Sequence, residues 1–131
     1  MQYNKSRHAS FLLNAHIVFV TKYRKKLLSD LHHQAFRTAA GQVCAEVGVT
    51  LKECNGEEDH VHLLIDYPPS VQLTKLINSL KSVTSRRLRG EFADLVDAYQ
   101  KPVLWSRSYF VSSCGGAPLE AVKEYIKNQQ G

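Results

Sequence analysis

The sequence predicts an α+β fold of the ferredoxin-like (RRM-like) class, in which an antiparallel sheet packs with helices. Apolar and polar residues alternate between His60 and Asp66, as in a strand that buries one face. Apolar residues recur at helical spacing from Leu73 to Val83, as in a helix that buries one stripe. The expected elements follow the order strand, helix, strand, strand, helix, strand, helix. This is the order of a ferredoxin-like sandwich with one additional C-terminal helix.

The first strand and the first helix are expected before residue 49. Residues 11–21 alternate loosely, as a strand would, and His16 is expected to face solvent or a polar interface. Asp30 is expected to cap a helix that runs to about Val47 and ends at Gly48. The residues expected to face inward from this helix are Phe36, Ala39, Ala40, Val43 and Val47.

Two strands and a second helix are expected next. Residues 49–56 are expected to form the second strand, and an acidic turn leads from it to the third. Pro68-Pro69 stops the third strand, and Ser70 is expected to cap the following helix. Gly90 marks its expected end, and residues 91–101 are expected to form a short helix or loop. The buried stripe of the helix is expected to contain Leu73, Leu76, Ile77, Leu80 and Val83.

A final strand and a final helix are expected to close the chain. Residues 103–113 contain Trp105 and other aromatic residues, as expected for a strand, and Gly115-Gly116 follows them. Pro118 suits the first turn of a helix over residues 119–129.

Length and composition indicate one soluble domain spanning residues 1–131. Hydrophobic residues make up 44% of the chain and charged residues 22%, which is ordinary for a globular protein. No stretch has the length and apolarity of a membrane span, and the N-terminus lacks a secretory signal, so we expect a cytoplasmic protein without a membrane partner. Cys44, Cys54 and Cys114 are odd in number and far apart, which favours reduced thiols over a zinc site or disulfides.

The distribution of charge suggests a polyanionic partner. Seventeen Lys and Arg residues against twelve Asp and Glu residues give a net charge of +5. The basic residues cluster at Lys22–Lys26 and Lys81–Arg89, whereas acidic residues gather at Glu53–Asp59. These basic clusters are either solvated faces or nucleic-acid contacts.

The triplet His60-Val61-His62 is the most informative motif. In a strand, side chains two residues apart point to the same face, about 6.7 Å apart. Two neutral imidazoles at that spacing can bind one divalent metal ion while Val61 points into the core. The alternative is a pair of exposed polar residues on a solvated strand.

Tyr125 and Gln129 form a second motif at the end of the chain. They lie four residues apart on the expected final helix, so they share one face beside the apolar stripe of Leu119, Val122 and Ile126. The alternative interpretation is a tyrosine at the edge of the core and a solvated amide.

Together, the motifs resemble those of the single-tyrosine HUH transposases of small bacterial insertion sequences, where U is a hydrophobic residue. The resemblance covers nearly the whole chain and includes TKYR at 21–24, DHVHLLID at 59–66 and Y-x-x-x-Q at 125–129. The HUH triplet alone is weak evidence, whereas the ordered set is specific.

The resemblance implies a DNA transposase with a ferredoxin-like fold and a C-terminal catalytic helix. Tyr125 would cleave single-stranded DNA at hairpin-marked element ends and form a 5′-phosphotyrosine. His60, His62 and Gln129 would bind Mg²⁺ or Mn²⁺. The family also implies a homodimer in which the tyrosine helix of one subunit completes the site of the other. The expected DNA contacts are Lys22, Arg24, Lys81, Arg86 and Arg87.

Three other functions remain open at this point. The chain could be a domesticated relative that processes repeated palindromic DNA. It could be a ferredoxin-like module that binds nucleic acid without cutting it, or a metal-dependent hydrolase in which Tyr125 is dispensable. The group that deprotonates Tyr125 is not identified by the sequence.

Overall fold

A four-stranded antiparallel sheet organises the protein. The computed structural model describes residues 4–5, 10–11, 13–113 and 119–129. The sheet has the strand order β4-β5-β3-β6, and the central strands are therefore β3 and β5. These strands are β3 (Asn14–Val20), β4 (Thr50–Gly56), β5 (His60–Asp66) and β6 (Phe110–Ser113). A separate pair, β1 (Asn4–Lys5) and β2 (Ser10–Phe11), precedes them.

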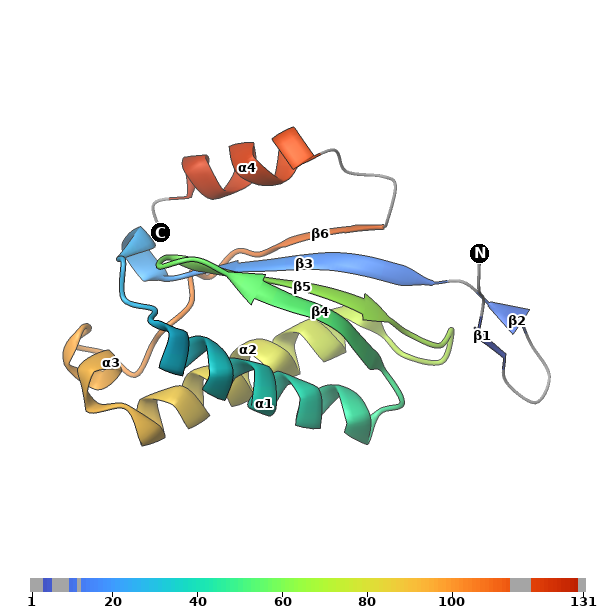
Figure 1. Ribbon diagram of the computed structural model, residues 1–131, viewed down its shortest axis with the longest axis horizontal. Helices are drawn as coiled ribbons and strands as arrows, with labels where there is room; N and C mark the ends of the chain where they lie inside the picture. The colour runs from blue at the N-terminus through green and yellow to red at the C-terminus, as the bar shows by residue number, and fades with distance from the viewer. Residues whose placement is uncertain (1–3, 6–9, 12, 114–118, 130–131) are drawn as a thin grey trace.

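Helices cover both faces of this sheet (Figure 1). α1 (Asp30–Glu46) and α2 (Leu73–Glu91) pack on one face, and α4 (Leu119–Asn128) lies over the other. The short helices η1 (Lys22–Arg24) and α3 (Ala93–Asp97) complete the fold. The expected ferredoxin-like class, with an additional C-terminal helix, is confirmed.

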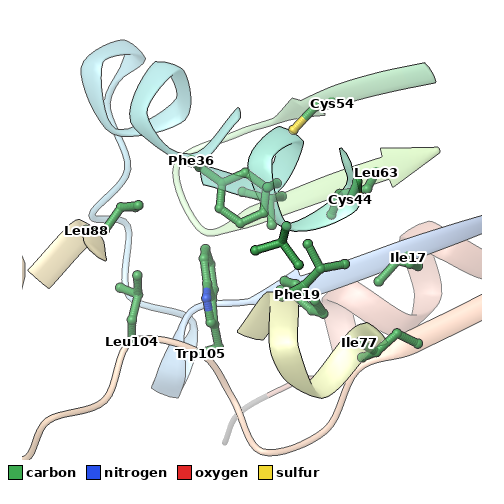
Figure 2. Close-up of a cluster of buried hydrophobic side chains, with 14 of the residues drawn as sticks. Ile17, Phe19, Phe36, Cys44, Cys54, Leu63, Ile77, Leu88, Leu104 and Trp105 are labelled. Atoms are coloured by element: carbon green, nitrogen blue, oxygen red, sulfur yellow. The ribbon is translucent and has the colours of Figure 1, made fainter. Parts of the chain in front are cut away.

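The main core lies between the sheet and the helices α1 and α2. Val61, Leu63 and Ile65 of β5 are fully buried there, as expected from the alternation. Figure 2 shows Phe19, Phe36 and Trp105 packed together in this core. Since strand side chains alternate, His60, His62 and Leu64 project from the opposite face, on the side of α4.

The start and the end of the first helix differ from the expected ones. Ser29 precedes α1 and forms a capping box with His32, whose Nδ1 accepts from the Ser29 backbone N–H at 2.9 Å. Asp30 is therefore the first helical residue, and its expected capping role is wrong. The expectation that Val47 faces inward is wrong: it follows the helix and is 48% exposed. Gly48 comes next and has a φ of 72°, as is common just after a helix end.

The second helix and the last strand also differ from expectation. Ser70 lies in a turn closed by the Val71 N–H and the Pro68 carbonyl, so Gln72 occupies the N-cap position of α2. The helix passes through Gly90 and ends at Glu91. Of the expected strand at 103–113, only Phe110–Ser113 forms a strand, and Trp105 adds a single bridge to Thr21. The Trp105 side chain lies in the core, where its Nε1 donates to Thr84 Oγ1.

The register of β4 against β5 is interrupted once. A bulge shifts the pairing between Leu51 and Glu53, and β4 and β5 are paired on both sides of it. β5 pairs with β3 without such a shift, from His60 opposite Val20 to Asp66 opposite Asn14.

Candidate active site

Three histidines, His16, His60 and His62, project from the α4 side of the central strands. His16 on β3 lies diagonally opposite His62 on β5, since Val18 is the direct partner of His62. The two rings stack with centroids 5.0 Å apart, and His16 Nδ1 lies 2.9 Å from His62 Nε2. Burial, followed by the neighbouring His16, lowers the pKa of His62, which favours a neutral imidazole. His16 was not among the expected site residues, because strand pairing is not visible in the local sequence.

His60 has a carboxylate partner. Its Nδ1 lies 2.9 Å from Oδ1 of Asp59, and Oδ2 of Asp59 lies 3.2 Å from Nε of Arg24. The Asp59 side chain lies in the acidic turn before β5 but is only 14% exposed. A carboxylate at Nδ1 fixes the ring orientation and leaves Nε2 as the nitrogen that can bind a metal ion.

Arg24 connects this ion pair to α4. Its Nη1 donates to the carbonyl oxygen of Lys127 at 2.9 Å. Arg24 was expected to contact DNA, but in this conformation two of its donor nitrogens are bonded within the protein. The side chain therefore links the position of the C-terminal helix to the partner of His60.

Tyr125 and Gln129 lie together, as their spacing predicts, and Ser108 joins them. The Ser108 hydroxyl lies 3.2 Å from the Tyr125 hydroxyl and donates to Gln129 Oε1 at 2.7 Å. Either hydroxyl can donate in this contact: Ser108 Oγ accepts from the neutral phenol when its own proton is directed to Gln129, and it can donate to the phenolate when that proton turns to Tyr125. Burial raises the pKa of Tyr125, and the hydrogen bond to Ser108 partly opposes that shift. Ser108 was not expected to be a site residue.

A row of cross-strand neighbours relates Tyr125 to the histidines. The Tyr125 ring packs on Phe110 with centroids 5.4 Å apart. Phe110 is the β6 partner of Val18, and Val18 is the β3 partner of His62, so all three side chains share one face. Adjacent strands lie about 4.8 Å apart, which puts Phe110 and His62 roughly 10 Å apart along this row.

The donor atoms at this face suit a divalent ion that accepts nitrogen and oxygen. In the described part of the chain, no three His, Cys, Asp or Glu side chains gather closely enough to hold an ion. An ion held by the two imidazoles would need a ligand of another type, and the amide oxygen of Gln129 has suitable donor chemistry. Gln129 Oε1 accepts from Ser108 in this conformation, so metal binding would replace that hydrogen bond. His62 contacts His16 through Nε2, so Nδ1 is the nitrogen of His62 that could bind the ion while this contact remains.

The remaining basic residues expected to bind DNA lie in different surroundings. Lys81 donates to the carbonyl oxygens of Ser106 at 2.8 Å and Arg107 at 2.9 Å, so it supports the backbone beside Ser108. Burial, followed by the positive charge of Lys22, lowers the pKa of Lys81. Lys22 itself is half-buried in η1.

Arg86 and Arg87 lie on α2, which covers the other face of the sheet from α4 (Figure 1). Both are exposed, and Arg87 Nη1 donates to Gln42 Oε1 on α1. The structure does not bring these two arginines to the histidines.

No helix in the described ranges is both long and apolar enough to cross a membrane.

Comparisons with known proteins agree with this fold and these motifs. The family model described as "Transposase IS200 like" matches residues 9–129. The transposase for insertion sequence element IS200 of Salmonella typhimurium LT2 is 29% identical over 122 residues, which cover 93% of this chain and 80% of that protein. The ISDra2 transposase TnpA of Deinococcus radiodurans is 22% identical over 129 residues, which cover 98% of this chain and 92% of that protein.

Solved structures show the same arrangement of helices and strands. A crystal structure of a Deinococcus radiodurans protein assigned as a transposase superposes with a TM-score of 0.86 at 25% identity, covering 98% of both chains. A REP-associated tyrosine transposase bound to a REP hairpin superposes with a TM-score of 0.58 at 10% identity, covering 94% of this chain and 68% of that one, and shows the fold alone. Since the family model spans nearly the whole sequence, this chain belongs to the IS200-like transposases.

Proposed function

We propose that this transposase cleaves and rejoins single-stranded DNA at hairpin-marked element ends, with Tyr125 as the nucleophile. The observation that carries the proposal is the row Phe110, Val18 and His62, which relates the tyrosine to the histidine pair on one face of the sheet. The DNA hairpin bound by the REP-associated neighbour supports a hairpin as the DNA partner.

The proposed chemistry is a transesterification. The Tyr125 hydroxyl loses its proton and its oxygen bonds to the scissile phosphorus. The bond from phosphorus to the 3′ oxygen breaks, and that oxygen takes up a proton as a 3′-hydroxyl. The phosphotyrosine retains a reactive ester, so a second 3′-hydroxyl can displace Tyr125 without ATP. The phenol starts neutral, because burial raises its pKa, and its O–H is oriented by Ser108.

His60, His62 and Gln129 are the proposed ligands of Mg²⁺ or Mn²⁺. A bound divalent ion supplies positive charge that polarises a phosphate oxygen and stabilises the leaving 3′ oxygen. Asp59 orients His60, and His16 contacts His62, so each imidazole has a partner on the protein. Neutral ligands bind Mg²⁺ loosely, and we expect firm binding only when DNA phosphate is present.

A covalent adduct between protein and DNA tests this function. Wild-type protein incubated with single-stranded element ends and Mn²⁺ should give an adduct that survives denaturation. Tyr125→Phe removes only the hydroxyl and should abolish the adduct while hairpin binding persists. Tyr67→Phe, beyond the end of β5 that is remote from His60, is the matched control and should retain the adduct. An unchanged adduct yield in Tyr125→Phe would eliminate the assignment.

We further propose a homodimer in which the tyrosine helix of one subunit completes the histidine site of the other. Gly115-Gly116, which would be either a hinge or an ordinary helix-entry turn, and the expected first-turn Pro118 lie outside the described residues. Within one chain, α4 lies over its own sheet (Figure 1), and the same contacts could form on a partner's sheet.

Mixing two inactive variants separates the two arrangements. Tyr125→Phe subunits retain the histidines, and His60→Ala subunits retain the tyrosine. If sites are shared, mixed dimers contain one intact site, and partial cleavage returns after subunit exchange. If each site forms within one chain, a verified heterodimer remains inactive.

A further inference from the structure

Tyr23 is held in an unusual position beside the candidate active site. Its side chain is 61% exposed and its φ is 61°, and the following Arg24 has a φ of 53°. Residues other than glycine rarely adopt this left-handed backbone conformation. It persists where contacts with the surrounding structure hold the backbone in place. Here the Lys22 N–H donates to the Leu104 carbonyl, and the Tyr99 hydroxyl donates to the Lys22 carbonyl at 2.6 Å.

Because Tyr23 and Arg24 both have positive φ values, their side chains have different surroundings. Arg24 bonds to Asp59 and to the carbonyl oxygen of Lys127, within the candidate active site. Tyr23 presents its ring to solvent. A large aromatic ring exposed on a constrained backbone, one residue from the site, is suited to contact a ligand that extends from that site.

The Tyr23 ring borders a cavity of about 410 Å³, which we call the tyrosine groove. Tyr99 is the second aromatic residue, and its ring centroid lies 6.4 Å from that of Tyr23. Lys22 Nζ lies 5.2 Å from the Tyr23 centroid, and Lys25 Nζ lies 4.7 Å from the Tyr99 centroid. The charged residues lining the groove are Lys22, Lys25, Lys101 and Asp97.

The chemistry of this groove indicates the class of ligand. Three lysines and one aspartate give it a net positive charge, which attracts phosphate. An exposed aromatic ring offers a face on which an unpaired base can stack, and proteins that bind single strands combine these two features. A base within a duplex is already stacked on both sides and is not accessible in this way.

We propose that the tyrosine groove binds one unpaired nucleotide of a DNA strand that extends from the active site. Tyr23 stacks on the base, and Lys22 and Lys101 neutralise its phosphates. Tyr99, whose hydroxyl is bonded to the Lys22 carbonyl, forms the floor of the groove. This inference rests on the proposed action on single-stranded DNA.

Binding of a fluorescent oligothymidylate, measured by anisotropy without added metal, tests the groove. Tyr23→Ala should weaken binding about tenfold, the scale of one lost base stack, whereas Tyr23→Phe retains the ring and should bind like the wild type. Lys22→Gln should reduce the dependence of affinity on salt by about one counterion, and Lys75→Gln, on exposed α2 surface, is its control. Photo-cross-linking with bromodeoxyuridine should label the peptide that contains Tyr23.

The outcomes distinguish this proposal from the proposed function. If Tyr23→Ala binds oligothymidylate as tightly as the wild type, the groove proposal is wrong, even when the wild type forms the covalent adduct. If the wild type forms no adduct but Tyr23→Ala loses affinity, the groove is supported and the proposed catalysis is wrong. A variant that fails to fold is recognised by circular dichroism, and the cross-linked peptide in the wild type then decides the question.

Discussion

His16 and His62 form a stacked pair on adjacent strands, with His16 Nδ1 2.9 Å from His62 Nε2. One of these two nitrogens must carry the shared proton, so each ring determines the tautomer of its neighbour. The pair makes His16 a positioning residue for an expected metal ligand.

His16→Ala should therefore weaken metal binding without unfolding the protein. Loss of the ring that holds His62 should reduce Mn²⁺ affinity in the presence of DNA by about ten- to a hundredfold, as for other partners of metal-binding histidines. Electron paramagnetic resonance of free Mn²⁺ measures this. His33→Ala, on α1, is a histidine control that should retain affinity. Equal affinity in His16→Ala would show that the pair only stabilises the sheet.

His60→Ala and His62→Ala should each abolish cleavage in Mg²⁺ or Mn²⁺. A single imidazole and an amide leave too few ligands to fix an ion over the phosphate. Excess chelator should have the same effect on the wild type, and gel analysis of a labelled strand measures both. Full cleavage by either variant, or by the chelated wild type, would show that His60 and His62 are exposed polar residues without a role in metal binding.

Arg24→Lys should loosen α4. A lysine carries one ammonium group and cannot reproduce the separate contacts of Nε with Asp59 and Nη1 with Lys127. Hydrogen exchange in residues 119–129 should accelerate, while exchange in α1 and α2 remains unchanged. Arg86→Lys, on the exposed surface of α2, should have no effect. Unchanged exchange in Arg24→Lys would mean that other contacts hold the helix.

Ser108→Ala should raise the pKa of Tyr125 further. Burial already raises this pKa, and a hydrogen bond donated by Ser108 to the ionised oxygen opposes the shift, so its loss leaves burial unopposed. Carbon-13 NMR titration of labelled tyrosine measures the change, with Ser112→Ala on β6 as the control. A lower pKa in Ser108→Ala would show that Ser108 acts mainly as an acceptor from the neutral phenol, and the prediction would be wrong.

Cys44 and Cys54 should destabilise the fold at high pH. Burial raises the pKa of both thiols from 9.0 to about 11. Below pH 9.0 the folded and unfolded chains both hold these protons; above it the unfolded chain loses them first, so the free energy of unfolding falls as the pH approaches about 11. Thermal melts across this range should decline less steeply in a Cys44→Ala, Cys54→Ala variant. Parallel declines would assign the loss to other groups.

Local patterns predicted the parts of this molecule that depend on local geometry. The alternation in β5 was sufficient to separate His60 and His62 from Val61, because strand side chains alternate whatever their partners are. The four-residue spacing of Tyr125 and Gln129 similarly brought them together on α4.

Contacts between distant segments were not predictable in this way. Ser108 joins Tyr125 only because the chain before β6 passes beneath α4, and His16 meets His62 only through strand pairing. The Trp105 indole N–H likewise has its buried partner, Thr84, on the distant helix α2. These contacts depend on the tertiary arrangement, which hydrophobic periodicity does not encode.

The uninterrupted pairing of β5 with β3 has a consequence for folding fidelity. A slip of β5 by one residue would turn two imidazoles into the core and expose Val61, Leu63 and Ile65. A misregistered chain would therefore lose its core and its histidine pair together, and no stable but inactive conformer of this kind should accumulate. The bulge at Leu51 and Glu53 lies on the other neighbour, β4, so irregular pairing is confined to the edge of the sheet.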